Sequence, residues 1–113
     1  MNKYATTALK AAELISSGLD PRSAWEKASC LYFEAGSSSQ KKGCPKNAFL
    51  GLYGINPTGK NATYAITALN YLKHNPRETS VERLWEIANN GSRIKHNSQM
   101  NVVLALWQAG YIR

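Results

Sequence analysis

Apolar residues recur along most of this chain at a spacing close to 3.6 residues, the period of an amphipathic helix. In the first segment the stripe is formed by Tyr4, Ala8 and Ala12. Gly18 follows the segment, and glycine is the usual left-handed residue just beyond a helix end. We therefore predict a first helix over residues 3–17.

Start and stop residues divide the next part of the chain into two further helices. Asp20 is a favourable N-cap, Pro21 suits a first helical position, and Gly36 marks the expected end of this second helix. Pro45 likewise suits the first position of a third helix, with Cys44 at or next to its cap. The polar residues 37–43 between them have no reason to pack, so we expect an unpacked loop.

Two more helices follow after a glycine-containing loop. The fourth is expected to be capped by Asn61 or Thr63 and to close at Pro76. Thr79 and Glu82 have the spacing of a capping box, in which a hydroxyl and a glutamate three residues later satisfy the first backbone N–H groups. This box predicts a fifth helix that begins near residue 81 and ends at residues 90–91.

The last helix is expected to be capped by Asn97 or Ser98 and to stop at Gly110. Its apolar residues occupy much of the circumference, which predicts a position in the middle of the core. A short strand over residues 48–53 is an alternative for part of the third helix. The pattern as a whole predicts an all-α fold, a single domain over residues 1–113 with about six short helices arranged as helical hairpins.

Composition adds a charge bias to this picture. Fourteen Lys and Arg residues against seven Asp and Glu give a net charge of +7, and no acid lies between Glu34 and Glu78 or after Glu86. Clustered positive charge attracts phosphate backbones and acidic protein surfaces, although it can also serve solubility alone. The candidate binding residues in these acid-free stretches are Lys41, Lys42, Lys46, Lys60, Arg93 and Lys95.

No apolar run approaches the roughly 20 residues that a membrane-spanning helix needs. The first 18 residues lack the uninterrupted apolar core of a signal peptide, so we expect a helix there instead. We therefore predict a cytoplasmic protein with no membrane partner, in which Cys30 and Cys44 are free thiols.

Residues 54–60 read G-I-N-P-T-G-K, which is the spacing of a phosphate-binding loop. The usual hydroxyl is replaced by Asn61, and Pro57 removes one amide donor, so an ordinary loop between helices is the favoured interpretation. Lys60 beside a helix start is still a plausible contact for an anion. Tyr53 and Tyr64 flank this loop and are the aromatic residues best placed to line a cleft or stack on a base.

Cys44 is the candidate nucleophile. The positive end of a helix, together with Lys42 and Lys46, would favour its thiolate form, and His96 or His74 could act as a base. Nothing in the sequence places either histidine beside it, and a capping or partly buried cysteine is the favoured interpretation. Cys30, beside the stripe of the second helix, is expected to be structural.

Other chemistry finds no support in the sequence. No pair of cysteines or histidines has the spacing of a metal site, so neither a metal nor an organic cofactor is expected. The C-terminal segment invites comparison with a helix-turn-helix, but its connection is long and its last helix carries no Arg or Lys to read bases. Contacts to the phosphate backbone from Arg93, Lys95 and His96 are the expected alternative.

Two segments carry a resemblance, GCPKNAFLGL at residues 43–52 and HNSQMNVVLALWQAGYI at residues 96–112. They resemble motifs of a small bacterial protein family of unknown function and of about this chain length. The match extends more loosely over AWEKA at residues 24–28. The resemblance implies that the middle and the end of the chain belong to one folding unit, and it carries over no catalytic role.

These observations leave three hypotheses open. The first is a small basic, non-enzymatic module that binds nucleic acid or another acidic partner. The second is a protein-interaction or regulatory protein, for example in bacterial defence or phage biology. The third is an enzyme that depends on Cys44, which nothing beyond that residue's setting supports.

Overall fold

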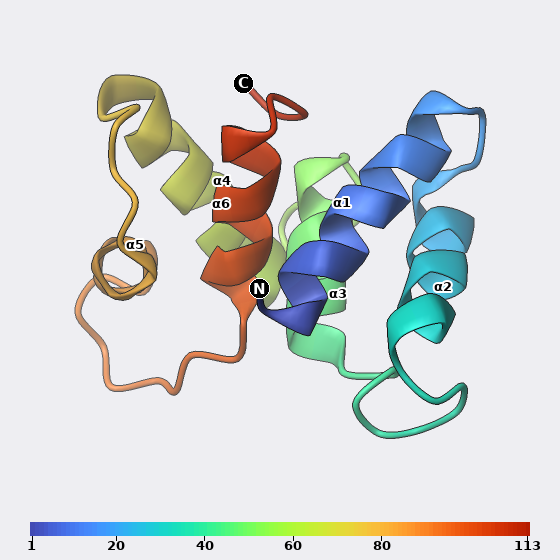
Figure 1. Cartoon of the computed structure of the whole chain (residues 1–113). Coiled ribbons are helices and arrows are strands. Elements are labelled where there is room, and N and C mark those ends of the chain that lie inside the picture. Colours follow the sequence, from blue (N-terminus) through green and yellow to red (C-terminus); the bar gives the residue numbers. More distant parts are fainter.

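Six α-helices and no strand make up the computed structural model, which describes residues 1–113 (Figure 1). The helices are α1 (Lys3–Ser16), α2 (Pro21–Tyr32), α3 (Gly43–Leu52), α4 (Lys60–His74), α5 (Val81–Ala88) and α6 (Gln99–Gln108). The predicted all-α fold is confirmed. Residues 48–53 lie in α3 and its C-cap, so the strand considered for them is wrong.

Helix α6 stands at the centre of the molecule, as its apolar circumference predicts. It contacts α1, α3, α4 and α5, while α1 pairs with α2 and α3 pairs with α4 as helical hairpins (Figure 1). Met100, Val102, Val103 and Leu106 on α6 are completely buried. Because one short helix touches four others, the two hairpins share a single hydrophobic core.

The helix boundaries confirm some of the predicted signals and correct others. Asp20 caps α2 by accepting a hydrogen bond from the backbone N–H of Ser23 at 3.1 Å. Helix α3, however, begins at Gly43 with Lys42 as its N-cap, so Pro45 occupies the third helical position and Cys44 is not the cap. Proline is tolerated there because the N–H groups of the first turn have no partner within the helix.

Helix α4 also begins earlier than predicted, at Lys60, with Gly59 as its N-cap. Neither Asn61 nor Thr63 caps it. The Thr63 hydroxyl donates back to the Gly59 carbonyl at 2.8 Å, and the Asn61 side chain is engaged by Gln99 of α6. The Asn61 side chain, which the local sequence predicts as a cap, therefore makes a tertiary hydrogen bond instead.

The start of α5 uses different residues from the predicted capping box. Ser80, not Thr79, is the N-cap, and its hydroxyl accepts from the backbone N–H of Arg83 at 3.1 Å. The carboxylate that satisfies the backbone N–H groups of residues 79 and 80 belongs to Glu78, at 3.1 and 3.2 Å. Glu82 instead accepts only from the Ser80 hydroxyl, at 3.4 Å.

The connection between α2 and α3 is packed, which corrects the prediction of an unpacked loop. Helix α2 ends at Tyr32, before Gly36, and Gln40 from the connection is only 3% exposed. Its side-chain N–H₂ donates to the Ser29 hydroxyl at 2.8 Å and to Glu26 at 3.2 Å, while its oxygen accepts from the N–H of Gly36. Buried amides persist only where such partners exist, so this glutamine fixes the loop on α2.

Helices α3 and α4 approach each other most closely at Gly51. A side-chain carbon added at Gly51 would lie 2.7 Å from the Cα of Ala62 and would overlap its Cβ. The glycine is therefore required by packing, since any larger residue would force the two backbones apart. Gly54 then ends α3 with a φ of +85°.

We expect Gly51→Ala to lower the free energy of unfolding by about 1–3 kcal/mol, because the clash outweighs the roughly 1 kcal/mol of helix propensity that alanine adds. Urea denaturation followed by circular dichroism measures the change. Gly43→Ala is the matched control, because the added carbon there meets only the flexible end of Asn47 at 3.5 Å. Equal stability of the two variants would contradict the close approach.

Candidate functional site

The N-terminal ends of α1, α4 and α6 meet at one end of the molecule. Asn2 caps α1, accepting from the backbone N–H groups of Tyr4 and Ala5 at 2.8 and 3.1 Å. The N–H₂ of the same side chain donates to the hydroxyl of Ser98, the N-cap of α6, at 3.3 Å. One asparagine thus links the starts of two helices that are 96 residues apart in sequence.

Gln99, the first residue of α6, links the start of α4 to the same end. It is 2% exposed, and its N–H₂ donates to the side-chain oxygen of Asn61 at 3.0 Å. Its oxygen accepts from the backbone N–H of Asn97 at 2.7 Å. Lys60, next to Asn61, is thereby held near the segment that carries Lys95.

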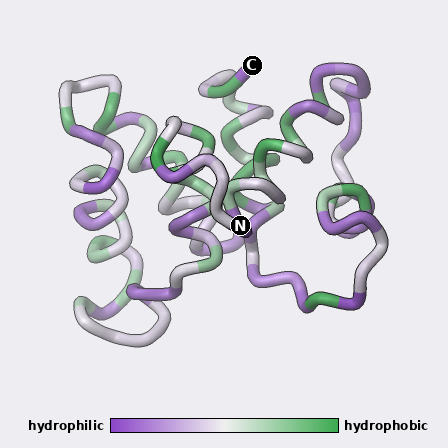
Figure 2. Tube along the Cα trace, turned by 180° about the vertical axis from the view of Figure 1, so that it is seen from behind, coloured by the Kyte–Doolittle hydropathy of each residue, from purple (hydrophilic) through white to green (hydrophobic).

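The connection between α2 and α3 reaches this end as well. The Tyr4 hydroxyl of α1 donates to the backbone carbonyl of Ser39 at 2.8 Å, and burial raises the pKa of that tyrosine. Figures 1 and 2 show the connections 33–42 and 89–98 at the same lower edge of the molecule, seen from opposite sides. The two connections lie on opposite sides of this edge, and we use the name basic end for residues 41–46, 60 and 93–95 taken together.

The basic end is defined by the six candidate binding residues. Four of them, Lys41, Lys60, Arg93 and Lys95, are exposed, whereas Lys42 and Lys46 are half-buried. None takes part in an ion pair, because the two ion pairs of the chain join Lys10 to Glu13 and Arg83 to Glu86. The cations are therefore available to a partner.

Helix electrostatics reinforce these charges. Each helix carries about half an elementary positive charge at its N-terminus, which acids in the first turn normally offset. No acid lies in the first turn of α1, α3, α4 or α6, and α3 and α4 have no side-chain cap either. Lys42 and Lys60 stand instead where a negative or capping residue is usual.

The segment that carries Arg93 and Lys95 is fixed from α5. The indole N–H of Trp85 donates to the backbone carbonyl of Ile94 at 2.9 Å. The His96 ring packs against the same indole with ring centres 5.1 Å apart. The sequence does not reveal this role of Trp85, since a side chain bonded to a loop carbonyl leaves no periodic signal.

The candidate nucleophile and bases are not brought together. The Nε2 atom of His96 accepts the backbone N–H of Met100 at 3.0 Å, so its lone pair is already used at the start of α6. His74 is exposed and lies against the carbonyl of Asn70, and no hydrogen bond joins either histidine to Cys44. His96 is thus a capping residue in this fold.

The loop with phosphate-loop spacing forms a small cleft of about 230 Å³. Its lining residues are Asn47, Ile55, Asn56, Gly59, Lys60, Asn61 and Ala62. The loop follows a helix rather than a strand, which is not the setting of a phosphate-binding loop. Tyr53 and Tyr64 do not line this cleft, because they pack on Phe49 and Trp85 with ring centres 4.9 Å apart in each case.

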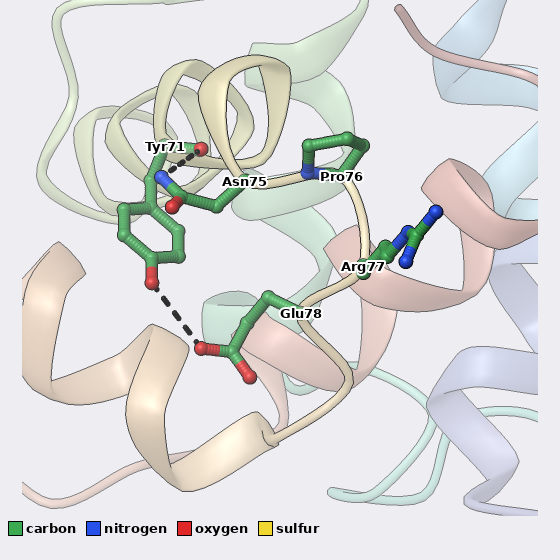
Figure 3. Close-up of a pocket in the computed structure, with 5 residues that line it drawn as sticks. All are labelled: Tyr71, Asn75, Pro76, Arg77 and Glu78. Atoms are coloured by element: carbon green, nitrogen blue, oxygen red, sulfur yellow. Dashed lines mark hydrogen bonds between the residues drawn. The ribbon is translucent and has the colours of Figure 1, made fainter.

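A larger hollow of about 380 Å³ lies at the other end of α4 (Figure 3). Its polar groups already satisfy one another. The Tyr71 hydroxyl donates to Glu78 at 3.3 Å, Asn75 donates to the Tyr71 carbonyl at 3.1 Å, and Arg77 points away from both. We find no convergent set of free polar groups in it that would bind a ligand.

The molecule is therefore an all-α domain with a net charge of +7, and the whole chain supports a family assignment. A family model described as a family of unknown function (DUF6979) matches residues 1–113, so the chain belongs to that family. No curated protein and no solved structure matches it. No helix has the length and apolar character to cross a membrane, and no three potential ligand residues cluster to hold a metal ion.

An enzyme that depends on Cys44 would need Cys44 to be the more accessible of the two thiols, and the structure shows the reverse. Cys30, expected to be structural, is exposed, and Cys44 is half-buried. We expect iodoacetamide near neutral pH to label Cys30 at least as fast as Cys44, because access limits the reaction of the half-buried thiol. Mass spectrometry of timed digests measures both rates. Rapid, stoichiometric labelling of Cys44 well ahead of Cys30 would contradict this expectation and would support an enzyme that depends on Cys44.

Proposed function

We propose that this domain is a non-enzymatic binding module whose basic end contacts an acidic partner, namely the phosphate backbone of nucleic acid. The binding residues are Lys41, Lys42, Lys46, Lys60, Arg93 and Lys95. The observation that carries the proposal concerns the starts of α3 and α4, where Lys42 is the N-cap and Lys60 follows the Gly59 N-cap, with no acid in either first turn.

A cation at the positive end of a helix is unfavourable by roughly 0.3–1 kcal/mol, the reverse of the usual stabilisation by an acid. The chain has this arrangement at two helix starts, those of α3 and α4. Local rules of stability are most often broken where function requires it. A phosphate would accept hydrogen bonds from the uncapped N–H groups and would neutralise the adjacent lysines.

The fold favours backbone contacts over base reading. Helix α6, the counterpart of a recognition helix, is buried between four other helices and cannot enter a major groove. The candidate cations lie on loops and on first helical turns instead. Lys and Arg in such positions contact phosphates and position a protein without reading sequence.

The proposal also covers the location of the protein and one alternative function. We place the protein in the cytoplasm, where nucleic acid is accessible and thiols such as Cys30 and Cys44 stay reduced. The protein-interaction hypothesis remains the alternative. It differs in one respect that can be measured, since a contact through apolar or loop surfaces depends less on salt than one through phosphates.

We expect the affinity for labelled duplex DNA of mixed sequence to fall steeply with salt. The slope of log K against log salt should approach about −5 if all six cations contact phosphates, since each contact contributes about −0.9. Lys41→Glu combined with Lys42→Glu should reduce the slope by about 2 and weaken binding about tenfold or more. Fluorescence anisotropy over a series of salt concentrations measures both quantities.

Lys73→Glu combined with Arg77→Glu is the matched control, because it changes the net charge equally in and just after the last turn of α4, at the upper edge of Figure 1. We expect it to weaken binding much less. Equal weakening in both double variants would mean that net charge, and not the basic end, accounts for binding. A protein partner that stays bound in high salt and tolerates the Lys41 and Lys42 reversals would establish the interaction alternative.

A further inference from the structure

The segment 92–97 is held to the fold by a short set of contacts around His96. The ring accepts the backbone N–H of Met100 through Nε2 at 3.0 Å and packs against Trp85, which in turn donates to the carbonyl of Ile94. Figure 2 shows this connection as a mostly hydrophilic segment at the lower edge of the molecule. The segment is therefore attached through the His96 imidazole, through the Trp85 indole and, at Asn97, through the Gln99 side chain.

Only the neutral imidazole can make the bond to Met100. A proton on Nε2 would place two donors against each other and leave the N–H at the start of α6 without an acceptor. The charged ring would also face the positive end of α6. Protonation must therefore break the contact that His96 makes with α6.

The groups around His96 mostly oppose its charge. Arg93 and Lys95 lie in its own segment, and Tyr64 of α4 packs against Trp85. Burial lowers the pKa of His96 from its usual 6.5, and Glu82 of α5 partly offsets this by attracting the proton. The pKa of His96 therefore lies below its usual value, and the ring is neutral at neutral pH.

We propose that His96 is a pH-sensitive latch, which holds the segment 92–97 against the start of α6 and releases it when the ring takes up a proton. The released segment carries three positive charges, on Arg93, Lys95 and His96, instead of two. This inference rests on the proposed function for its consequence alone, which is that the latch regulates binding at the basic end. The conformational step itself occurs without any ligand.

The sign of the effect on stability follows from the lowered pKa. As the pH falls, the unfolded chain binds the proton first, near 6.5, and the folded chain only below that value. The stabilisation from the neutral latch is therefore complete above the unfolded pKa. It is lost progressively as the pH falls through 6.5 toward the folded pKa.

The test is nuclear magnetic resonance of the ¹⁵N-labelled full chain between about pH 8 and about pH 4.5, because burial can lower the pKa of a histidine well below its usual range. We expect the Met100 amide and the Trp85 indole N–H signals to shift together in one transition whose midpoint lies below 6.5. His96→Gln, which keeps an oxygen acceptor but cannot be charged, should abolish the transition. His74→Gln, at an exposed histidine away from Trp85, should leave it unchanged.

Constant signals in the wild-type chain, or the same transition in His96→Gln, would overturn the latch. These spectra contain no nucleic acid, so their outcome is independent of the proposed function. Duplex DNA binding over the same pH range then tests the regulation, and the salt slope should steepen by about 0.9 in the wild type alone. An unchanged slope would overturn regulation of the basic end, whereas no DNA binding at either pH would overturn the proposed function and leave the latch standing.

Discussion

The two hydrogen bonds of the buried Gln99 side chain hold together the start of α4, the start of α6 and the segment before α6. A buried amide is costly to leave unpaired, by about 1–3 kcal/mol, so these bonds specify one arrangement of the three parts. Asn2 extends the same link to α1. Neutral amides thus fix the starts of α1, α4 and α6, and Lys60 lies next to one of the residues that they join.

This arrangement has an electrostatic consequence. The converging starts of α1, α4 and α6 repel one another weakly, and Lys60 at the start of α4 adds to the repulsion. The hydrophobic core beneath, with α6 at its centre and Gly51 allowing close packing of α3 on α4, supplies the stability that tolerates it. An anionic partner would relieve this repulsion on binding, which connects the packing of the core with the proposed function.

Much of the fold was predictable from the sequence, whereas the site was predictable only as a set of residue types. Helical periodicity identified all six helices and the central position of α6, because burial of an apolar stripe acts locally. The caps of α3, α4 and α5 were mispredicted, since Lys42, Gly59 and Ser80 occupy those positions. The tertiary partner of Asn61 could not be read from its neighbours in sequence. Gln40, Gln99 and the role of His96 in capping were likewise missed, because contacts between distant segments leave no spacing to detect.

The central claim, that the Asn61–Gln99 contact holds the starts of α4 and α6 together, is tested most directly by a double-mutant cycle on folding stability. The chains compared are the wild type, Asn61→Ala, Gln99→Ala and the double variant, each unfolded in urea. The account predicts a coupling free energy of about 1 kcal/mol, because each single change leaves the other amide without its partner. Additive effects, with a coupling indistinguishable from zero, would contradict it and would mean that the helix starts are held together by other contacts.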